Sequence, residues 1–457
     1  MKKSSVLAAV LALGIATAAT TACAFENEFH GMFSARYINS NFNRTATTDF
    51  NAIGGSEYDP TGTTRKQFVA NFVEQRARLQ YIAKANADLK LVTHLEFDYS
   101  YWGNSSYSVG RNQGGAIGAD SVQIETKSVY LDANPIKNVN LKLGMQPFSD
   151  SFKGLLFDAD MAGAVVTSSY NHFTPTLGYF RFQDSGAKKD KVLGHLVNDM
   201  FVLDAKYEAS KNLKVGAAYY NIRDNSKTSF SVPAHNDVKM NVLGLNAEYV
   251  AGPLTVNGLG LFEVGTIDTR STTAWALNAG TKLKVGPGTA RTELLYVSGE
   301  ANSTGHSNAF YAVPGVENGS HGFYDTELVI LGRDKNAYTT DNAIIFNTGN
   351  KDQGQILASM GYNLPINSKL TTAANLGVAW IAHKNANTFK NAATAKPNAT
   401  NFLGTEINAE ATYQLLEGFS ASVRAGYVIL GGHFDNVALN GTPVNPYDAK
   451  LIFKYTF

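Results

Sequence analysis

Three residues of one short segment have the side chains and the spacing that a divalent metal site uses. His94, Glu96 and Asp98 lie two residues apart, so in a β-strand they point to the same face. Neighbours on one face of a strand are about 7 Å apart, however, so the three cannot reach one ion without a bend or ligands from elsewhere. We therefore predict no metal site.

Catalytic and cofactor chemistry have no better support. The chain has 9 His and many Ser, but no spacing singles out a Ser, His and carboxylate set. Its 1 Cys is Cys23, so a Cys-x-x-Cys-His motif for haem attachment is absent. Gly258 and Gly260 lack the strand-to-helix context of a phosphate-binding loop. We predict neither an enzyme nor a cofactor.

The composition favours a folded chain built of strands and turns. Of 457 residues, 44% are hydrophobic and 17% are charged, which excludes both a disordered chain and a bundle of membrane-spanning helices. The 39 basic residues balance 38 acidic ones, so there is no basic field to hold a nucleic acid. The 41 Gly, 22 Tyr and 26 Phe, against 12 Pro, are typical of β-structure.

Residues 1–24 have the pattern of a secretory signal peptide. Lys2 and Lys3 precede an apolar run, and small residues follow up to an Ala-x-Ala site that ends at Ala24. Cleavage there removes the only Cys, so we expect no disulfide. Lipidation of Cys23 is the alternative, but Thr20 stands where lipoprotein signals usually carry an aliphatic residue.

The rest of the chain alternates apolar and polar residues with a period of two, the pattern of a strand with one face in lipid and the other in water. In the segment 89–99, for example, Leu89, Leu91 and Leu95 share one face, and Lys90, Glu96 and Asp98 share the other. We count about eighteen such segments, with sixteen as the alternative. They are 28–38, 68–84, 89–101, 120–132, 138–147, 162–170, 173–183, 198–209, 212–223, 237–250, 253–264, 272–284, 289–299, 353–363, 369–381, 403–414, 418–430 and 446–457.

The connections between these segments alternate between short and long. The short ones are turn-like, such as Gly252-Pro253 and Gly286-Pro287-Gly288. The long ones are polar and include 39–67, 102–119, 183–197, 300–352, 382–402 and 431–445. This asymmetry predicts a transmembrane antiparallel β-barrel with short periplasmic turns and long extracellular loops. We expect 300–352 outside the cell and Asn86 in the periplasm.

Aromatic residues support this orientation, because rings with a polar edge gather at the membrane interfaces. Trp102, Trp275 and Trp380 each fall at the end of a strand beside a long connection. Seven tyrosines gather at the opposite ends, on the apolar faces: Tyr81, Tyr130, Tyr207, Tyr249, Tyr362, Tyr413 and Tyr455.

The C-terminus resembles the signal that bacterial outer-membrane barrels present to their insertion machinery, with Phe453, Tyr455 and the terminal Phe457 on one face. The whole chain from 25 to 457 resembles the bacterial outer-membrane porins in length and loop pattern. The start from Phe25 to Gly31 and the overall layout are similar to porin-like proteins of metal-respiring bacteria. The resemblance implies a homotrimer, contact with outer-membrane lipid, and a third long connection, near 147–161, that folds into the lumen and narrows it.

That connection carries Asp150, Lys153, Asp158 and Asp160. The facing strands supply His94 and charged residues to the lumen: Arg36, Arg76, Arg78, Lys84, Lys90, Lys127, Lys142, Glu74, Glu96, Asp98 and Glu125. The resemblance implies an acidic loop opposite a basic wall, with a transverse field that orients polar solutes. The side chains of Arg76 and Arg78 are expected to point into the lumen, because the opposite assignment of the strand faces would leave two arginines in hydrocarbon.

We therefore predict an outer-membrane porin, a water-filled channel for passive diffusion of ions and small polar solutes. An energised receptor would need a plug domain before the first strand. The sequence leaves no room for one, because the first strand begins a few residues after the cleavage site. A barrel that acts as a scaffold or conduit for an exported partner, such as an outer-membrane cytochrome, is the alternative.

Overall fold

The computed structural model describes residues 26–42, 69–104, 115–118, 124–186, 191–226, 237–301, 305–313, 324–334, 343–385, 400–434 and 444–457. The predicted signal peptide, residues 1–24, lies outside this range. Within the described ranges, no helix is long and apolar enough to span a membrane.

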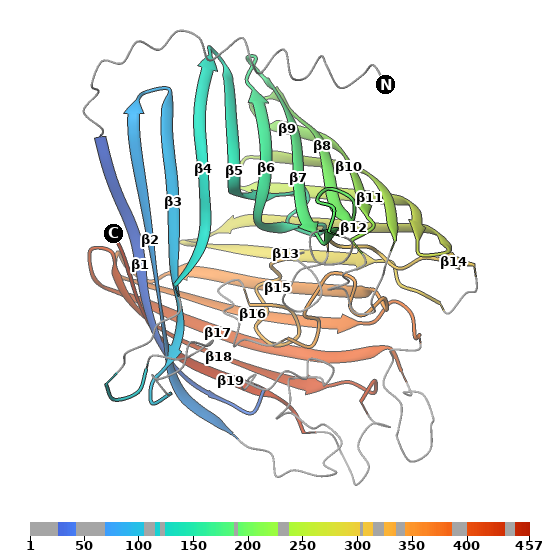
Figure 1. The fold of residues 1–457 in the computed structure, drawn as a ribbon. Helices are drawn as coiled ribbons and strands as arrows, with labels where there is room; N and C mark the ends of the chain where they lie inside the picture. Colours follow the sequence, from blue (N-terminus) through green and yellow to red (C-terminus); the bar gives the residue numbers. More distant parts are fainter. Residues whose placement is uncertain are drawn as a thin grey trace, which may run out of the picture.

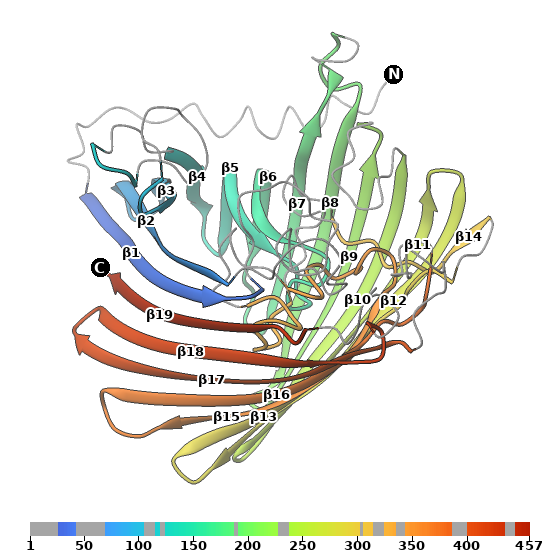
Figure 2. The ribbon, with the colours of Figure 1, turned by 90° about the horizontal axis from the view of Figure 1, so that it is seen from below.

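The described chain forms one sheet that closes on itself (Figures 1 and 2). Each long strand pairs antiparallel with its neighbours in the sequence, and β1 pairs with both β2 and β19. The strands are β1 (Glu26–Ser40), β2 (Ala70–Asn86), β3 (Leu89–Tyr101), β4 (Ile124–Ile136), β5 (Val139–Ser149), β6 (Asp158–Ser168), β7 (Phe173–Asp184), β8 (Val197–Ser210), β9 (Leu213–Asp224), β10 (Val238–Ala251), β11 (Leu254–Ile267), β12 (Arg270–Val285), β13 (Gly288–Val297), β14 (His306–Ser307), β15 (Gln355–Pro365), β16 (Leu370–Trp380), β17 (Phe402–Leu416), β18 (Phe419–Leu430) and β19 (Tyr447–Thr456).

The barrel wall has eighteen strands. The two-residue β14 pairs parallel with the start of β12, inside the long connection from β13 to β15, and β13 pairs directly with β15. Each of the eighteen predicted segments overlaps one wall strand, with ends that differ by a few residues. The predicted fold class and strand number are therefore confirmed.

Tight turns join the strands at one end of the barrel. Eight connections there have two to four residues, from the β2–β3 turn to the β17–β18 turn. Gly252 and Gly286 take φ values of +59° and +58° in two of these turns, a conformation in which other residues are strained. At the opposite end the connections are longer, except between β11 and β12, where only Asp268 and Thr269 intervene.

Side chains alternate between the two faces of the wall as the sequence pattern predicts. Leu89, Leu91 and Val129 are exposed on the outer face, whereas Glu74 and Glu96 are buried on the inner face. Trp102, Trp275 and most of the predicted tyrosines are outside. Tyr130 is an exception, because the exposed Val129 and Leu131 on either side of it place its ring inside, where Lys142 lies 5.6 Å from the ring centroid.

The C-terminal residue, Phe457, extends the backbone pairing between β19 and β1. Phe457 N–H donates to the carbonyl of Gly31 at 3.1 Å, and Gly31 N–H donates to the carbonyl of Phe457 at 2.9 Å. The Phe457 ring packs so closely over Gly31 that a Cβ there would lie 2.5 Å from the ring. Gly31 therefore makes room for the last aromatic of the predicted assembly signal.

The hydrophobic core lies inside the barrel. Buried apolar side chains on the inner faces of β6 to β18 form one cluster with buried residues of the segments 150–157, 309–313 and 324–331. In Figure 2 the segments that connect β13 to β15 lie within the curve of the wall. Apolar and buried polar side chains thus alternate on the inner wall that inserted chain covers, whereas the wall of β1 to β5 carries charged side chains.

Candidate channel interior

A carboxylate holds the connection between β5 and β6 in a compact loop. The buried Asp150 side chain accepts backbone N–H bonds from Phe152 (2.7 Å), Gly154 (2.9 Å), Leu156 (2.7 Å) and Phe157 (2.9 Å). Burial raises the pKa of Asp150 to about 6, and the four N–H donors oppose that rise. This carboxylate therefore organises the loop from within.

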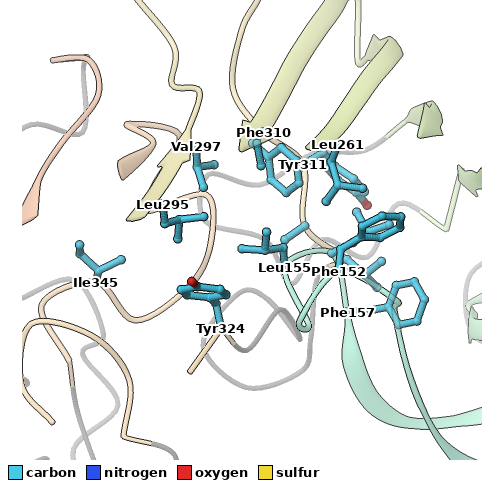
Figure 3. Close-up of a cluster of buried hydrophobic side chains, with 14 of the residues drawn as sticks. Phe152, Leu155, Phe157, Leu261, Leu295, Val297, Phe310, Tyr311, Tyr324 and Ile345 are labelled. Carbon is cyan, nitrogen blue, oxygen red and sulfur yellow. The ribbon is translucent and has the colours of Figure 1, made fainter. Parts of the chain in front are cut away.

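The loop reaches across to strands far around the barrel. The Phe152 ring packs on Gly244 of β10, where a Cβ would lie 2.1 Å away, and meets Tyr220 edge-on with 6.1 Å between ring centroids. Lys153 Nζ lies 2.9 Å from Glu293 Oε1 on β13 and 2.9 Å from Asn278 Oδ1 on β12. Figure 3 shows Phe152, Leu155 and Phe157 in one cluster with side chains of β11 and β13.

A second inserted segment comes from the connection between β13 and β15. Tyr311 N–H donates to Glu263 Oε2 on β11 at 2.8 Å, and Val313 N–H donates to the carbonyl of Leu156 at 2.9 Å. The two inserted segments therefore contact each other as well as the wall. Tyr311 and Tyr324 lie in the same cluster as Phe152 (Figure 3).

The same connection is anchored on β17 to β19. Glu406 of β17 accepts N–H bonds from Val329 (2.7 Å), Ile330 (3.0 Å) and Leu331 (2.7 Å). Asp334 pairs with Arg424 at 2.5 Å and with Lys450 at 3.6 Å. The expectation that all of 300–352 lies outside is thus wrong for its described central part, because buried carboxylates of the wall bind its backbone.

Six of the seven basic residues predicted on the facing strands lie on the opposite part of the wall and are paired with carboxylates, whereas Lys142 lies against the Tyr130 ring. Arg36 bonds Glu74, and both Arg76 and Arg78 bond Glu96. Lys84 bonds Glu28, Lys90 lies 3.3 Å from Asp132, and Lys127 lies 2.5 Å from Asp160. The structure thus brings Arg76, Arg78 and Glu96 together as one cluster.

The carboxylates of the predicted acidic loop are placed differently, and this corrects the expected transverse field. Asp150 is buried within its own loop, because it caps four backbone N–H groups. Asp158 and Asp160 belong to strand β6, where Asp158 bonds Ser149 and Asp160 bonds Lys127. Lys153 is held by Glu293 on the far wall. The loop therefore presents no row of free carboxylates to the arginines.

The three residues that were considered as metal ligands, His94, Glu96 and Asp98, have different surroundings. Glu96 is held by two arginines, His94 is half-buried beside it, and the side chain of Asp98 lies outside the described part. Glu125 is half-buried on β4, opposite Glu96. Among the described residues no group of His, Cys, Asp and Glu side chains could hold a metal ion.

Four residues that anchor the inserted chain were not predicted from the sequence, namely Glu263, Glu406, Asp334 and Arg424. One signal was present: near Glu263 the sequence Leu259-Gly260-Leu261-Phe262 is apolar on both faces, which a strand between lipid and water is not. Similar stretches occur around Val202, Val242 and Leu295, all in the hydrophobic core. They mark the part of the wall that inserted chain covers.

Comparisons with solved structures agree on the architecture. OpdK, an outer membrane protein of Pseudomonas aeruginosa, matches with 12% identity and a TM-score of 0.54, over 94% of this chain and 99% of that one. This chain has the fold of bacterial outer-membrane porins. OccAB4 of Acinetobacter baumannii matches with 13% identity, a TM-score of 0.54 and coverage of 94% and 98%. A BenF-like porin from Pseudomonas fluorescens Pf-5 matches with 14% identity, a TM-score of 0.52 and the same coverage.

These identities are low, so the likeness concerns the porin fold. No family model matches the sequence, and no curated protein matches it either.

Proposed function

We propose that the chain is an outer-membrane porin, a passive water-filled channel for ions and small polar solutes. The porin fold with eighteen strands supports this, because barrels of sixteen to eighteen strands leave room for an aqueous lumen. One observation carries the proposal. Three cations on the inner face of β2 to β4 are accessible to water, with side-chain exposures of 28% for Arg78, 40% for Lys90 and 29% for Lys127.

The solute path is proposed to follow this charged wall. The segment 150–157, which contacts β12 and β13, and the segment 324–334, which contacts β17 to β19, would narrow the channel on those sides. Arg76 and Arg78 both bond Glu96, so two guanidinium groups lie together on this part of the inner wall. A positive group in a narrow aqueous path favours anions locally. The selectivity would then depend on Arg76 and Arg78 more than on the balanced net charge of the chain.

The test is the reversal potential of the purified protein in a planar bilayer under a salt gradient. Arg76→Ala/Arg78→Ala should shift the reversal potential toward cations, because it leaves Glu96 uncompensated. The matched control, Lys211→Ala/Lys369→Ala, removes two charges from exposed turns and should leave the reversal potential close to wild type. An unchanged potential in an intact Arg76/Arg78 variant would remove this cluster from the path.

The orientation and partners follow from the same proposal. The short turns would lie in the periplasm and the long connections outside. The homotrimer and the contact of Phe453, Tyr455 and Phe457 with the insertion machinery stay predictions. The comparisons give no support to the alternative of a scaffold for an exported partner.

A further inference from the structure

The outer face of β7 to β10 carries a polar row that is unusual for a surface facing lipid. Arg181, Asp199, Arg223 and Lys239 are successive cross-strand neighbours on β7, β8, β9 and β10. All four have odd numbers, as do the exposed Leu177, Phe201, Leu203 and Leu243 on the same strands, so they share the outward face. The row lies at the end of the strands beside the long connections.

Two like charges are neighbours in this row. Arg223 and Lys239 lie directly opposite each other, an arrangement that costs stability unless an anion lies between them. Asp199 is bound by Arg181 through two bonds of 2.8 and 2.9 Å, and Arg181 also lies 3.6 Å from Asp184. Lys239 lies 3.0 Å from Asp237. Arg223 has no carboxylate within 4.0 Å in the described part of the chain, and its Nε donates only to Asn221 Oδ1, at 3.2 Å.

A hydrogen-bonded belt separates this row from the apolar surface beneath it. Tyr219 O–H donates to Asn241 Oδ1 at 2.7 Å, and Asn221 Nδ2 donates to the same oxygen at 2.8 Å. Hydroxyl and amide groups of this kind suit the boundary between lipid headgroups and hydrocarbon.

A broad apolar groove begins on the far side of the belt. The small outward residues Ala205, Ala217 and Gly260 form its floor, and Leu177, Leu203 and Leu277 stand at its sides. Its volume is about 940 Å³, and an adjoining hollow of about 650 Å³ continues it toward the short turns. Each alone is in the size range that holds a drug-sized ligand. Arg223 is four residues from Tyr219 at the groove, or about 13 Å along the strand.

We propose that this surface binds a phosphorylated lipid with several acyl chains, with a phosphate between Arg223 and Lys239 and the chains in the groove. The two opposed cations Arg223 and Lys239, and the continuity of the polar row with the apolar groove, select this occupant. Arg offers several N–H donors in the planar arrangement that phosphate oxygens accept. The inference rests on the proposed placement of the barrel in a membrane, with the long connections at the outer leaflet.

Native mass spectrometry of the detergent-purified barrel with hexa-acylated lipid A tests the proposal, with diacylglycerol as the lipid that lacks phosphate. The wild type should bind lipid A and not diacylglycerol. Arg223→Gln/Lys239→Gln should bind lipid A at least tenfold more weakly, and Lys211→Gln/Lys369→Gln, which removes two charges at the other end, should bind like wild type. Heat-modifiable mobility in electrophoresis checks that each variant is folded.

Two results would overturn the proposal. One is equal lipid A binding by the folded Arg223/Lys239 variant and the wild type. The other is an oligomer in lipid-free detergent that Leu245→Asn dissociates, because the groove would then be covered by a second copy of the chain. Neither result depends on conductance, so a failure here is distinguishable from a failure of the channel proposal.

Discussion

Replacing Asp150 with Ala should release the inserted loop between β5 and β6 while the barrel stays intact. The side chain accepts four backbone N–H bonds of 2.7 to 2.9 Å, and Phe152, Leu155, Leu156 and Phe157 are fully buried around it. Each N–H left without an acceptor in a buried site costs about 1–3 kcal/mol, so four cost roughly 4–12 kcal/mol if the loop stays in place. Undocking lets water satisfy these groups, so the loop should undock.

Limited digestion with trypsin reports this change, because Lys153 lies at the loop and is held by Glu293 in the docked state. We expect cleavage after Lys153 in the Asp150→Ala variant and protection of that bond in wild type. Asp184→Ala is the matched control, since Asp184 caps Gly186 and Gly194 in a different connection. Equal protection of Lys153 in a folded Asp150→Ala barrel would refute the role given to this carboxylate.

Three further predictions concern pH, assembly and topology. The pKa of Asp150 is raised from 3.8 to about 6 in the docked loop, so the docked loop binds a proton more tightly than the undocked loop. Docking should therefore strengthen by up to about 3 kcal/mol as the pH falls from 6 toward 4, and hydrogen exchange of the loop amides should become slower. Phe457→Ser removes the ring that packs over Gly31 and should lower the amount of heat-modifiable barrel in the membrane; wild-type amounts would contradict its role in assembly. On intact cells an impermeant thiol reagent should label Ile117→Cys and spare Asn86→Cys, and the reverse pattern would invert the orientation.

The strands of this barrel could be predicted from the sequence because each has one face in contact with apolar surroundings and one with polar ones. Apolar and polar residues therefore alternate in segments such as 89–101 and 446–457, and the tight turns mark the ends of the strands. The inward phase of Arg76 followed from the same reasoning, because the opposite phase would place charge in hydrocarbon.

The inserted chain could not be predicted in the same way. Its anchors join residues far apart in the sequence, such as Glu406 with the backbone of Leu331 and Asp334 with Arg424. The alternation of residues within one strand cannot predict such a contact. From the sequence alone, a carboxylate on the inner face is indistinguishable from one that is solvated in the lumen. Asp150 shows the same limit, since only the folded loop reveals that its carboxylate binds its own backbone.

The conductance of the purified wild-type protein in a planar lipid bilayer tests the central claim most directly. We expect discrete, ohmic current steps in symmetric salt, because the inner wall around Arg78, Lys90 and Lys127 is accessible to water. Electrophoresis of the same preparation must show the heat-modifiable mobility of a folded barrel. Folded protein that inserts into the bilayer and carries no current would contradict the porin proposal.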